Sequence, residues 1–406
     1  MIYRPMPARS CPVCGTTVIN RFLTLRDVPV NCSALWFSEE RARTALRGSI
    51  ELALCTQCGM IFNAAFDSTR VEYDLTYDNS LSYSATFQAF SRELANRLVD
   101  VYDLHGKDLM EVGCGKGDFL ELLCAVGGNR GIGFDPSAQP RQEPGRFTIE
   151  ARVFTAGESR KADFLLCRHV LEHINDPHNF LTAVWGCLAE RQGAFYFEVP
   201  DARSVLDGPT LWDVIYPHCS YFTPPALRFL LESCGFEVAR LDTTFGGQFL
   251  MAEGKAAAVS NPPEPDTKAV GSLSRLARRF SEKLQAEMFG WSRFIEYALV
   301  ERRRIALWGA GAKAVTFLNV VPGANRIGAV IDINPRKHGS FVPCTAQPVL
   351  PPEALPGYHP DIIIVLNPLY EEEIRECARN FGQNPAIVLE PRLPLPPKEH
   401  PFALSA

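Results

Sequence analysis

The stretch DLMEVGCGKGDFL, residues 108–120, decides the fold. Its apolar start is typical of a short buried strand, with Glu111 near the strand end. Gly113, Gly115 and Gly117 then form a turn, because glycine lets the backbone pass close to a ligand. A helix is expected to follow, and its free N–H groups would face that ligand. The pattern predicts a nucleotide-type cofactor site, and alone it suits a dinucleotide equally well.

Short apolar stretches alternate with helical ones around this turn. An amphipathic helix is expected over residues 84–104, where apolar side chains recur at three- and four-residue steps. Strands are expected at 109–112, 131–134, 164–167 and 194–199. Such alternation predicts a parallel, doubly wound sheet with helices on both of its faces.

A carboxylate stands about twenty residues after the glycine turn, at the end of the next expected strand. It is Asp135, in the segment GIGFDPS. At that position a carboxylate can accept hydrogen bonds from both hydroxyls of a ribose. Together with the glycine turn, it predicts a cofactor that contains ribose.

Two CxxC pairs lie in the first sixty residues, Cys11 with Cys14 and Cys55 with Cys58. Four thiolates at this spacing can surround one tetrahedral Zn²⁺, and they leave no open position for catalysis. We therefore expect a structural zinc that stabilises the fold. The alternative is a set of ordinary buried thiols or a redox pair.

Composition limits the class of protein. The chain has 406 residues, so several domains are expected. A net charge of -5 gives no bulk-charge signal for nucleic-acid binding. Apolar runs are too short to span a membrane, and the first ten residues lack the apolar core of a signal peptide. Thirteen cysteines are then best explained by reduced thiols, which predicts a cytoplasmic protein.

A second α/β unit is expected near the C-terminus. The segment IALWGAGAKAV places Gly309 and Gly311 after a strand, and Asp332 follows about twenty residues later. The third glycine of a dinucleotide fingerprint is displaced by Lys313-Ala314, which disfavours NAD. Lys313 could instead meet the phosphate of a nucleotide sugar. The alternative is a wall of the fold without ligand contact.

Residues 85–255 resemble the class I methyltransferases. EVGCGKGDFL is similar to their first motif, FDPS to their second, and CRHVLEHINDPHNFL to the segment after their fourth strand. The resemblance implies S-adenosylmethionine (SAM) as cofactor, with residues 155–158 near its adenine. The implied cofactor-binding residues are Glu111, Gly113, Gly115, Asp135, Arg168 and His169. His173 is as well explained by packing against the helix that follows it.

Nearly the whole chain resembles the deoxysugar C-methyltransferases, which act on nucleotide-linked 4-ketosugars. The segment HCSYF places His218 where that family has its catalytic histidine. Pro217 stands where the family has a glutamate, and Phe-Gly-Gly-Gln at 245–248 replaces its His-Gly-Gly-Ser turn. The implied substrate-site residues are His218, Tyr216, Tyr221 and Gln248.

A ketosugar route needs a base for the proton α to the carbonyl and donors for the enolate oxygen. His218 is the expected base or orienting residue, and Tyr216, Tyr221 and Gln248 are the expected donors. Three alternatives stay open. The first is O- or N-methylation of another small molecule, the second is a non-catalytic binding protein, and the third is an oxidoreductase that uses the Gly309 site.

The expected fold class is α/β with four parts: a zinc-binding module at 1–75, a SAM-binding methyltransferase domain at 76–255, a linker with a long helix at 256–303 and a degenerate Rossmann-like domain at 304–406. The Ala-, Pro- and Ser-rich residues 256–272 are the expected linker. The long helix is expected to end in the basic run 302–304, and the proline-rich residues 391–406 to form an extended tail. The expected partner is a small-molecule substrate, with neither nucleic acid nor membrane, and the sequence predicts no oligomeric state.

Overall fold

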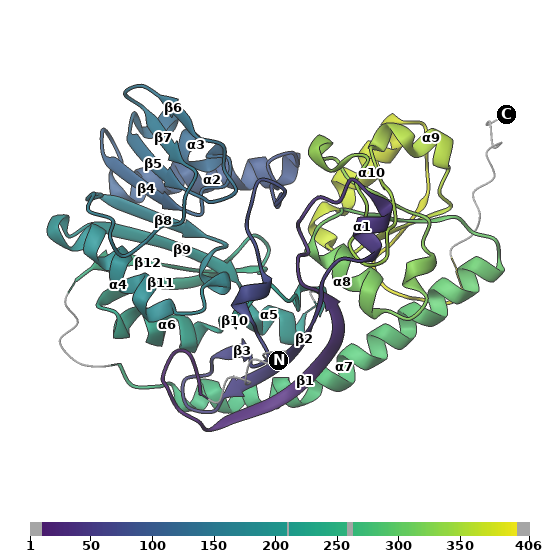
Figure 1. The fold of residues 1–406 in the computed structure, drawn as a ribbon, viewed down its shortest axis with the longest axis horizontal. Helices are drawn as coiled ribbons and strands as arrows, with labels where there is room; N and C mark the ends of the chain where they lie inside the picture. The colour runs from purple at the N-terminus through teal and green to yellow at the C-terminus, as the bar shows by residue number, and fades with distance from the viewer. Residues whose placement is uncertain (1–9, 209–210, 258–262, 396–406) are drawn as a thin grey trace.

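The computed structural model describes residues 10–208, 211–257 and 263–395, which form three sheets (Figure 1). The small sheet nearest the N-terminus has the strand order β1-β2-β3-β10. Its strands are β1 (Ile19–Pro29), β2 (Arg47–Cys55), β3 (Ile61–Asn63) and β10 (Ser220–Tyr221). β10 comes from the segment that carries His218, and Ser220 pairs with Phe62. The cysteine-rich part and the expected substrate loop therefore share one sheet.

The central sheet has eight strands in the order β11-β12-β9-β8-β4-β5-β7-β6. Its strands are β4 (Asp108–Val112), β5 (Arg130–Phe134), β6 (Arg141–Glu143), β7 (Phe147–Glu150), β8 (Phe164–Arg168), β9 (Ala194–Pro200), β11 (Phe236–Thr244) and β12 (Phe249–Ala256). The five strands from β7 to β9 are parallel. Four of them, β4, β5, β8 and β9, are the strands expected from the sequence, and β7 is an additional one. From β4 the chain first adds strands on one side of the sheet, β5 to β7, and then on the other side, β8 and β9. Open α/β sheets bind ligands at such a switch point, here between β4 and β8.

Helices cover both faces of this sheet, because each helix buries one apolar stripe against it. One core contains Leu94 and Leu98 of α2 (Ala85–Tyr102) with Leu120 and Leu123 of α3 (Asp118–Gly127). A separate core contains apolar residues of α4 (Pro177–Leu188) and α6 (Pro224–Ser233). The doubly wound fold class is therefore confirmed.

The third sheet is the second α/β unit. It is parallel, with the order β15-β14-β13-β16-β17. Its elements are β13 (Ile305–Trp308), α8 (Ala312–Val320), β14 (Ala329–Ile331), β15 (Val349–Leu350), α9 (Leu355–Tyr358), β16 (Ile362–Val365), α10 (Glu371–Asn380) and β17 (Ala386–Val388). The expected strands at the Gly309 turn are present, so this unit has the Rossmann-like form.

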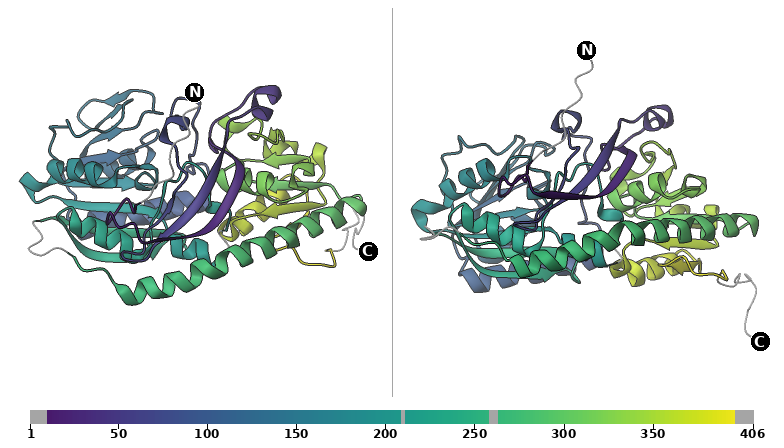
Figure 2. Two further views of the ribbon diagram at one scale, coloured as in Figure 1. Left: turned by 60° about the horizontal axis from the view of Figure 1, so that its bottom comes forward. Right: turned by 90° about the horizontal axis from the view of Figure 1, so that it is seen from below.

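Helix α7 (Thr267–Val300) runs along the molecule from the central part to the C-terminal part (Figures 1 and 2). It begins earlier than expected: residues 267–272, assigned to the linker by composition, are helical because Asp266 caps the first turn through the N–H of Ala269. It also ends earlier, at Val300, so the basic run 302–304 lies beyond the helix. Residues 258–262 of the expected linker lie outside the described residues.

The N-terminal residues reach the C-terminal unit, which the sequence did not suggest. Trp36 and Phe341 form a β-bridge, and the N–H of Cys344 donates to the carbonyl of Ala42 at 2.7 Å, near α1 (Glu39–Arg43). β1 also packs on α7, where the rings of Phe22 and Phe280 lie 6.2 Å apart. The first β-hairpin thus ties the two larger units together.

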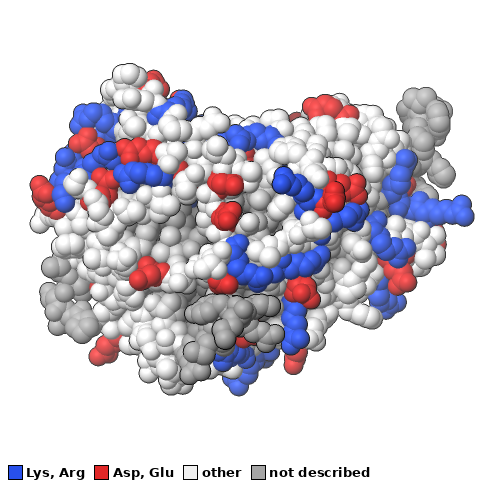
Figure 3. Space-filling view, in the orientation of Figure 1, with Lys and Arg blue, Asp and Glu red and all other residues white. Residues whose placement is uncertain are grey.

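The charged surface is mixed. On the face in Figure 3, Lys and Arg side chains lie among Asp and Glu side chains. In the part of the chain that the structure describes, no helix is both long and apolar enough to cross a bilayer. Of the expected tail, residues 396–406 lie outside the description.

Candidate functional site

One large cavity, of about 990 Å³, lies where the central sheet faces the C-terminal sheet. Its volume is at the upper end of the range of small-molecule sites. Its lining includes residues 73–84, the glycine turn after β4, the loop around His218 and the turn after β13. The carboxyl ends of both parallel sheets therefore contribute to the same cavity.

The glycine turn needs glycine for steric reasons. Gly113 has a φ of 74°, and a Cβ there would lie 1.9 Å from Cγ2 of Val170. The N–H of Gly115 donates to Oδ2 of Asp135 at 2.9 Å, and the N–H of Ser137 donates to Oδ1 at 2.7 Å. The structure thus brings together the glycines and the carboxylate that the sequence singled out.

Glu111 is a buried acceptor on the wall of the cavity. Only 3% of the residue is exposed, and Oε2 has no hydrogen-bond partner among the described residues. Burial raises the pKa of Glu111 to about 7, with Arg168 opposing. An unpartnered buried carboxyl oxygen beside a glycine turn and the start of α3 fits the cofactor that the sequence implies.

Arg168 is the last residue of β8, His169 follows it, and both line the cavity. Nε of Arg168 donates to Oε1 of Glu198 at 3.0 Å, and Nε2 of His169 lies 3.2 Å from the same oxygen. Burial alone would raise the pKa of Glu198, but Arg168 and His169 outweigh it and lower this pKa to about 2. Residues 155–158 are not among the lining residues, whereas Phe154 is.

His218 lines the same cavity and is 9% exposed. Its ring centroid lies 4.8 Å from that of His173. Burial, followed by His173, His169 and Lys313, lowers the pKa of His218 well below its usual range. The direction of this shift favours the neutral imidazole.

His173 has partners that explain its position. Its Nδ1 lies 2.8 Å from the hydroxyl of Tyr73 and 3.0 Å from the carbonyl oxygen of Pro217. Burial lowers the pKa of His173 to about 4. His173 thus connects residues 73–84 to the His218 loop.

Tyr216 and Tyr221 are not among the residues that line the cavity. The hydroxyl of Tyr216 accepts a hydrogen bond from the N–H of Asp67 at 3.2 Å. The hydroxyl of Tyr221 donates to the carbonyl of Ile215 at 2.8 Å. Both side chains contact backbone near β10, so they fix the loop that presents His218.

Gln248 lines the cavity at the junction of the two units. Its Nε2 donates to Oδ1 of Asn367 at 2.7 Å, and Nδ2 of Asn367 donates back to Oε1 at 3.1 Å. Phe245, which has a φ of 49°, stacks on Phe249 with centroids 5.1 Å apart. The turn at 245–248 therefore presents an aromatic wall and one amide to the cavity.

The turn after β13, on the C-terminal wall of the cavity, has the same arrangement as the glycine turn after β4. Oδ2 of Asp332 accepts from the N–H of Ala310 at 2.6 Å, just as Asp135 accepts from its own glycine turn. Lys313 forms an ion pair with Asp213, which lies in the loop before His218. Asp332, Lys313 and Asp213 all line the cavity, so this turn faces a ligand space.

Sequence reasoning missed a cluster of charged side chains around Asp78, which includes Lys116 of the glycine turn. The buried carboxylate of Asp78 is 2.7 Å from Nζ of Lys116 and 2.8 Å from Nε of Arg336, and Nδ2 of Asn334 donates to it at 2.8 Å. It also missed Tyr73, Tyr77 and Glu172, which line the cavity. The one available signal was the tyrosine-rich run YDLTYDNSLSY at 73–83.

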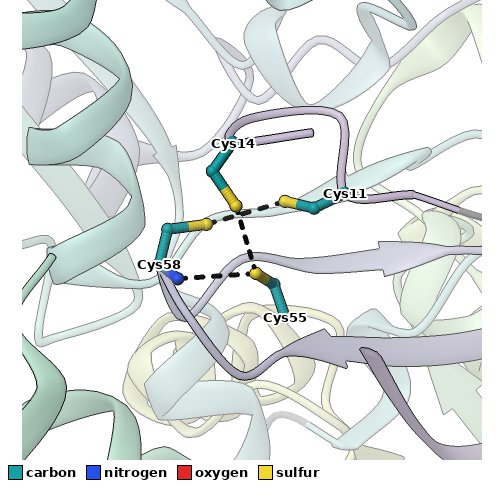
Figure 4. Close-up of side chains that lie close together, drawn as sticks. All are labelled: Cys11, Cys14, Cys55 and Cys58. Carbon is teal, nitrogen blue, oxygen red and sulfur yellow. Dashed lines mark hydrogen bonds between the residues drawn. The ribbon is translucent and has the colours of Figure 1, made fainter. Parts of the chain in front are cut away.

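The side chains of the four cysteines come together (Figure 4), and none of them lines the cavity. Sγ of Cys11 lies 3.6 Å from Sγ of Cys58, Sγ of Cys14 lies 3.4 Å from Sγ of Cys55, and all four sulfurs lie within 4.8 Å of one another. A tetrahedral zinc with Zn–S bonds of 2.3 Å separates its sulfurs by about 3.8 Å. The backbone N–H of Cys58 also points at Sγ of Cys55, at 3.4 Å. The donor set therefore fits a closed zinc site.

Comparisons with known proteins agree with this site. Residues 84–241 match the family described as methyltransferase domain, and residues 259–389 match the C-methyltransferase C-terminal domain. The chain is 25% identical over 401 residues to the C-methyltransferase NovU of Streptomyces niveus, covering 93% of this chain and 94% of that protein.

Solved structures with low overall similarity include two methyltransferases. One is magnesium protoporphyrin IX methyltransferase of Synechocystis PCC 6803 with bound S-adenosylhomocysteine, at 16% identity, 45% coverage of this chain, 91% of that chain and a TM-score of 0.34. The other is 1,6-didemethyltoxoflavin-N1-methyltransferase of Burkholderia thailandensis, at 15% identity, 43% and 81% coverage and a TM-score of 0.33. The family matches, together with the sequence motifs, carry the assignment. The chain therefore belongs to the class I S-adenosylmethionine-dependent methyltransferases, and among them to those with the C-methyltransferase C-terminal domain.

Proposed function

We propose that the enzyme transfers a methyl group to a carbon atom of a nucleotide-linked ketosugar, with His218 as the base. The observation that carries this proposal is the buried imidazole of His218 in a cavity that both α/β units line. A base in a low-dielectric site can remove the weakly acidic proton α to a carbonyl, provided that the enolate oxygen is stabilised. The sequence resemblance to deoxysugar C-methyltransferases supports the same acceptor class.

The cofactor end of the cavity is assigned to the glycine turn. Asp135 would accept the ribose hydroxyls, and Glu111, Arg168 and His169 would line the methionine portion. S-adenosylmethionine, when bound, supplies an activated methyl group, so the protein needs mainly to hold the acceptor carbon in line with it. Val153 and Phe154 line the cavity beyond Asp135 and are the proposed contacts of the adenine, in place of residues 155–158.

Gln248 and Lys313 line the cavity, whereas Tyr216 and Tyr221 do not. The amide of Gln248 faces the cavity and is the proposed donor to the enolate oxygen. The hydroxyls of Tyr216 and Tyr221 bond to backbone, so these side chains are proposed to position the His218 loop. Lys313, at the start of α8, is the proposed contact of a phosphate of the nucleotide, because its ion pair with Asp213 leaves it at the cavity wall.

We assign a structural Zn²⁺ to Cys11, Cys14, Cys55 and Cys58. The closed set of four sulfurs leaves no coordination position for a substrate, so its contribution is to folding. None of these four cysteines is in a disulfide bond in the structure. The cytosol, where thiols stay reduced, is the proposed compartment.

Replacing Asp135 by alanine is expected to weaken S-adenosylmethionine binding by roughly 10- to 100-fold, the loss typical of a hydrogen bond to a charged group. Isothermal titration calorimetry measures this directly. Asp242→Ala is the matched control, because Asp242 is an exposed residue of β11 that does not line the cavity. Equal affinities of wild type and Asp135→Ala would contradict the assignment of this carboxylate to the ribose.

The acceptor is tested with methyl-labelled S-adenosylmethionine and a panel of nucleotide-linked ketosugars and hydroxy analogues. Product mass spectrometry and NMR are expected to find the label on a carbon next to the ketone. Label on oxygen or nitrogen would replace the proposal by O- or N-methylation. The aromatic wall of Phe245 and Phe249 favours an acceptor with an apolar face in that case.

A further inference from the structure

His218 has no carboxylate beside it in the chain, because Pro217 precedes it. A carboxylate lies beside it in space. Glu172, in the 3-10 turn η2 (Leu171–His173), has a carboxyl oxygen within 4.8 Å of ring nitrogens of both His173 and His218. All three side chains line the cavity. The fold thus brings a carboxylate from the turn after β8 to the histidine of another loop.

The carboxyl group of Glu172 is buried close to several histidine rings. The residue is 2% exposed, and Oε2 has no hydrogen-bond partner among the described residues. Oε1 also lies 3.8 Å from Nδ1 of His169, so this second histidine is within ion-pair distance of the carboxylate. A buried carboxyl group that is only partly satisfied lowers stability, so its retention calls for a functional explanation.

We propose that Glu172 is the positioning residue of His218 and supplies the carboxylate that Pro217 does not. This inference rests on the proposed function, since it gives a partner to the base named there. The carboxylate would hold the imidazole in one orientation and would stand opposite the charge that develops on the ring. The arrangement follows the same logic as the carboxylate of a catalytic triad, which orients a histidine and stabilises its protonated form.

The proposed reaction has two parts, deprotonation of the acceptor and transfer of the methyl group. The C–H bond α to the carbonyl breaks, its proton goes to a ring nitrogen of His218, and its electron pair stays on the substrate as the enolate. The new C–C bond forms to the sulfonium methyl carbon while the C–S bond breaks and leaves its electron pair on sulfur. The imidazolium of His218 and the carboxylate of Glu172 then form an ion pair until the proton leaves for solvent.

The electrostatics explain why such a partner is needed. Burial, then His173, His169 and Lys313, lowers the pKa of His218, so an isolated imidazolium is strongly disfavoured there. Burial raises the pKa of Glu172 to about 7, against an opposing effect of His169. Glu172 therefore gains its negative charge as pH rises through neutrality, and turnover is expected to rise with it.

Several other groups face these two side chains and could contribute to the pH dependence. Around Glu172 and His218 they are His169, Glu198, Cys167, His173, Tyr73, Tyr77, Cys219, Tyr221 and Lys313 with its partner Asp213. Glu111, at the cofactor end, also has a pKa raised to about 7 by burial. A test must therefore separate Glu172 from these neighbours by substitution.

The variant Glu172→Gln keeps the shape of the side chain and removes its charge. We expect kcat to fall roughly 10- to 100-fold, since an opposite charge within 4–6 Å shifts a pKa by 1–3 units. The affinity of Glu172→Gln for S-adenosylmethionine should be unchanged, and the rise of its kcat through pH 7 should disappear. Glu172→Asp should restore part of the lost kcat and part of its pH dependence. Glu237→Gln, exposed on β11, is the matched control and should behave as wild type.

A second readout does not need the acceptor. In full-length protein saturated with S-adenosylmethionine, the ¹⁵N resonances of His218 should show a titration step near pH 7 that is absent from Glu172→Gln. If wild type methylates no ketosugar, the proposed function fails, and this titration still decides the pairing. A step that persists in Glu172→Gln, a step absent from wild type, or a lower kcat with an unchanged pH profile would each overturn the inference.

Discussion

His218→Ala is expected to lower turnover by roughly two to four powers of ten, the range for loss of a general acid or base. The affinity for S-adenosylmethionine should stay nearly unchanged, because the proposed cofactor contacts are Glu111, Asp135, Arg168 and His169. His218 stands on a different loop, which β10 anchors to the N-terminal sheet. Steady-state kinetics and calorimetry on the same preparation measure the two effects.

His105→Ala is the matched control, because this histidine is exposed on the loop before β4. It should retain wild-type turnover. Near-normal turnover of His218→Ala would contradict the assignment of the base, whatever the acceptor is. A parallel loss of cofactor affinity would instead indicate that the loop itself has collapsed, which thermal unfolding of the variant would reveal.

Loss of the zinc site is the second large effect. The variant Cys55→Ser/Cys58→Ser should reduce bound zinc from one ion per chain to almost none. Structural zinc in small modules contributes about 10–16 kcal/mol of binding free energy, which is comparable to the whole stability of a domain, about 5–15 kcal/mol. The sheet β1-β2-β3-β10 should therefore unfold, and β10 should release the His218 loop, so turnover should also be lost.

Elemental analysis, circular dichroism and kinetics on the purified variant test these three consequences. Cys377→Ser is the control, since this cysteine lies on α10, outside the cysteine cluster. It should keep its zinc and its activity. Wild-type protein that contains far less than one zinc per chain, or a double variant that stays folded and active, would contradict the structural role of the metal.

Much of the fold could be predicted because its signals are local. The glycine turn at 113–117 and Asp135 lie at the ends of neighbouring parallel strands, so the strand pattern alone brings them together. The second α/β unit could be predicted for the same reason. Each of its strands is a short apolar run beside a helical one.

The rest depends on contacts between segments distant in the chain. Asp78 is bound by Lys116, 38 residues away, and by Asn334, 256 residues away, and no local pattern indicates such partners. The resemblance to the deoxysugar C-methyltransferases implies Tyr216 as a donor to the enolate oxygen. Its hydroxyl instead faces Asp67, because the direction of a side chain in an irregular loop depends on what packs around it.

Glu172 illustrates the same limit. The sequence places it three residues after His169, in a motif that the resemblance assigned to the cofactor, and nothing in the spacing connects it to residue 218. Contacts between the two loops bring its carboxyl group there. One of them joins Sγ of Cys219 to the backbone carbonyl of Glu172 at 3.4 Å.

Hydrogen exchange at the acceptor tests the central claim most directly. Wild-type enzyme is incubated in D₂O with a nucleotide-linked 4-ketosugar and S-adenosylhomocysteine, so that no methyl group can be transferred. The proposal predicts that the proton α to the carbonyl exchanges with solvent, that His218→Ala abolishes this exchange and that His105→Ala does not. Methyl transfer by wild type without any such exchange, or equal exchange in His218→Ala, would contradict an enolate formed by His218.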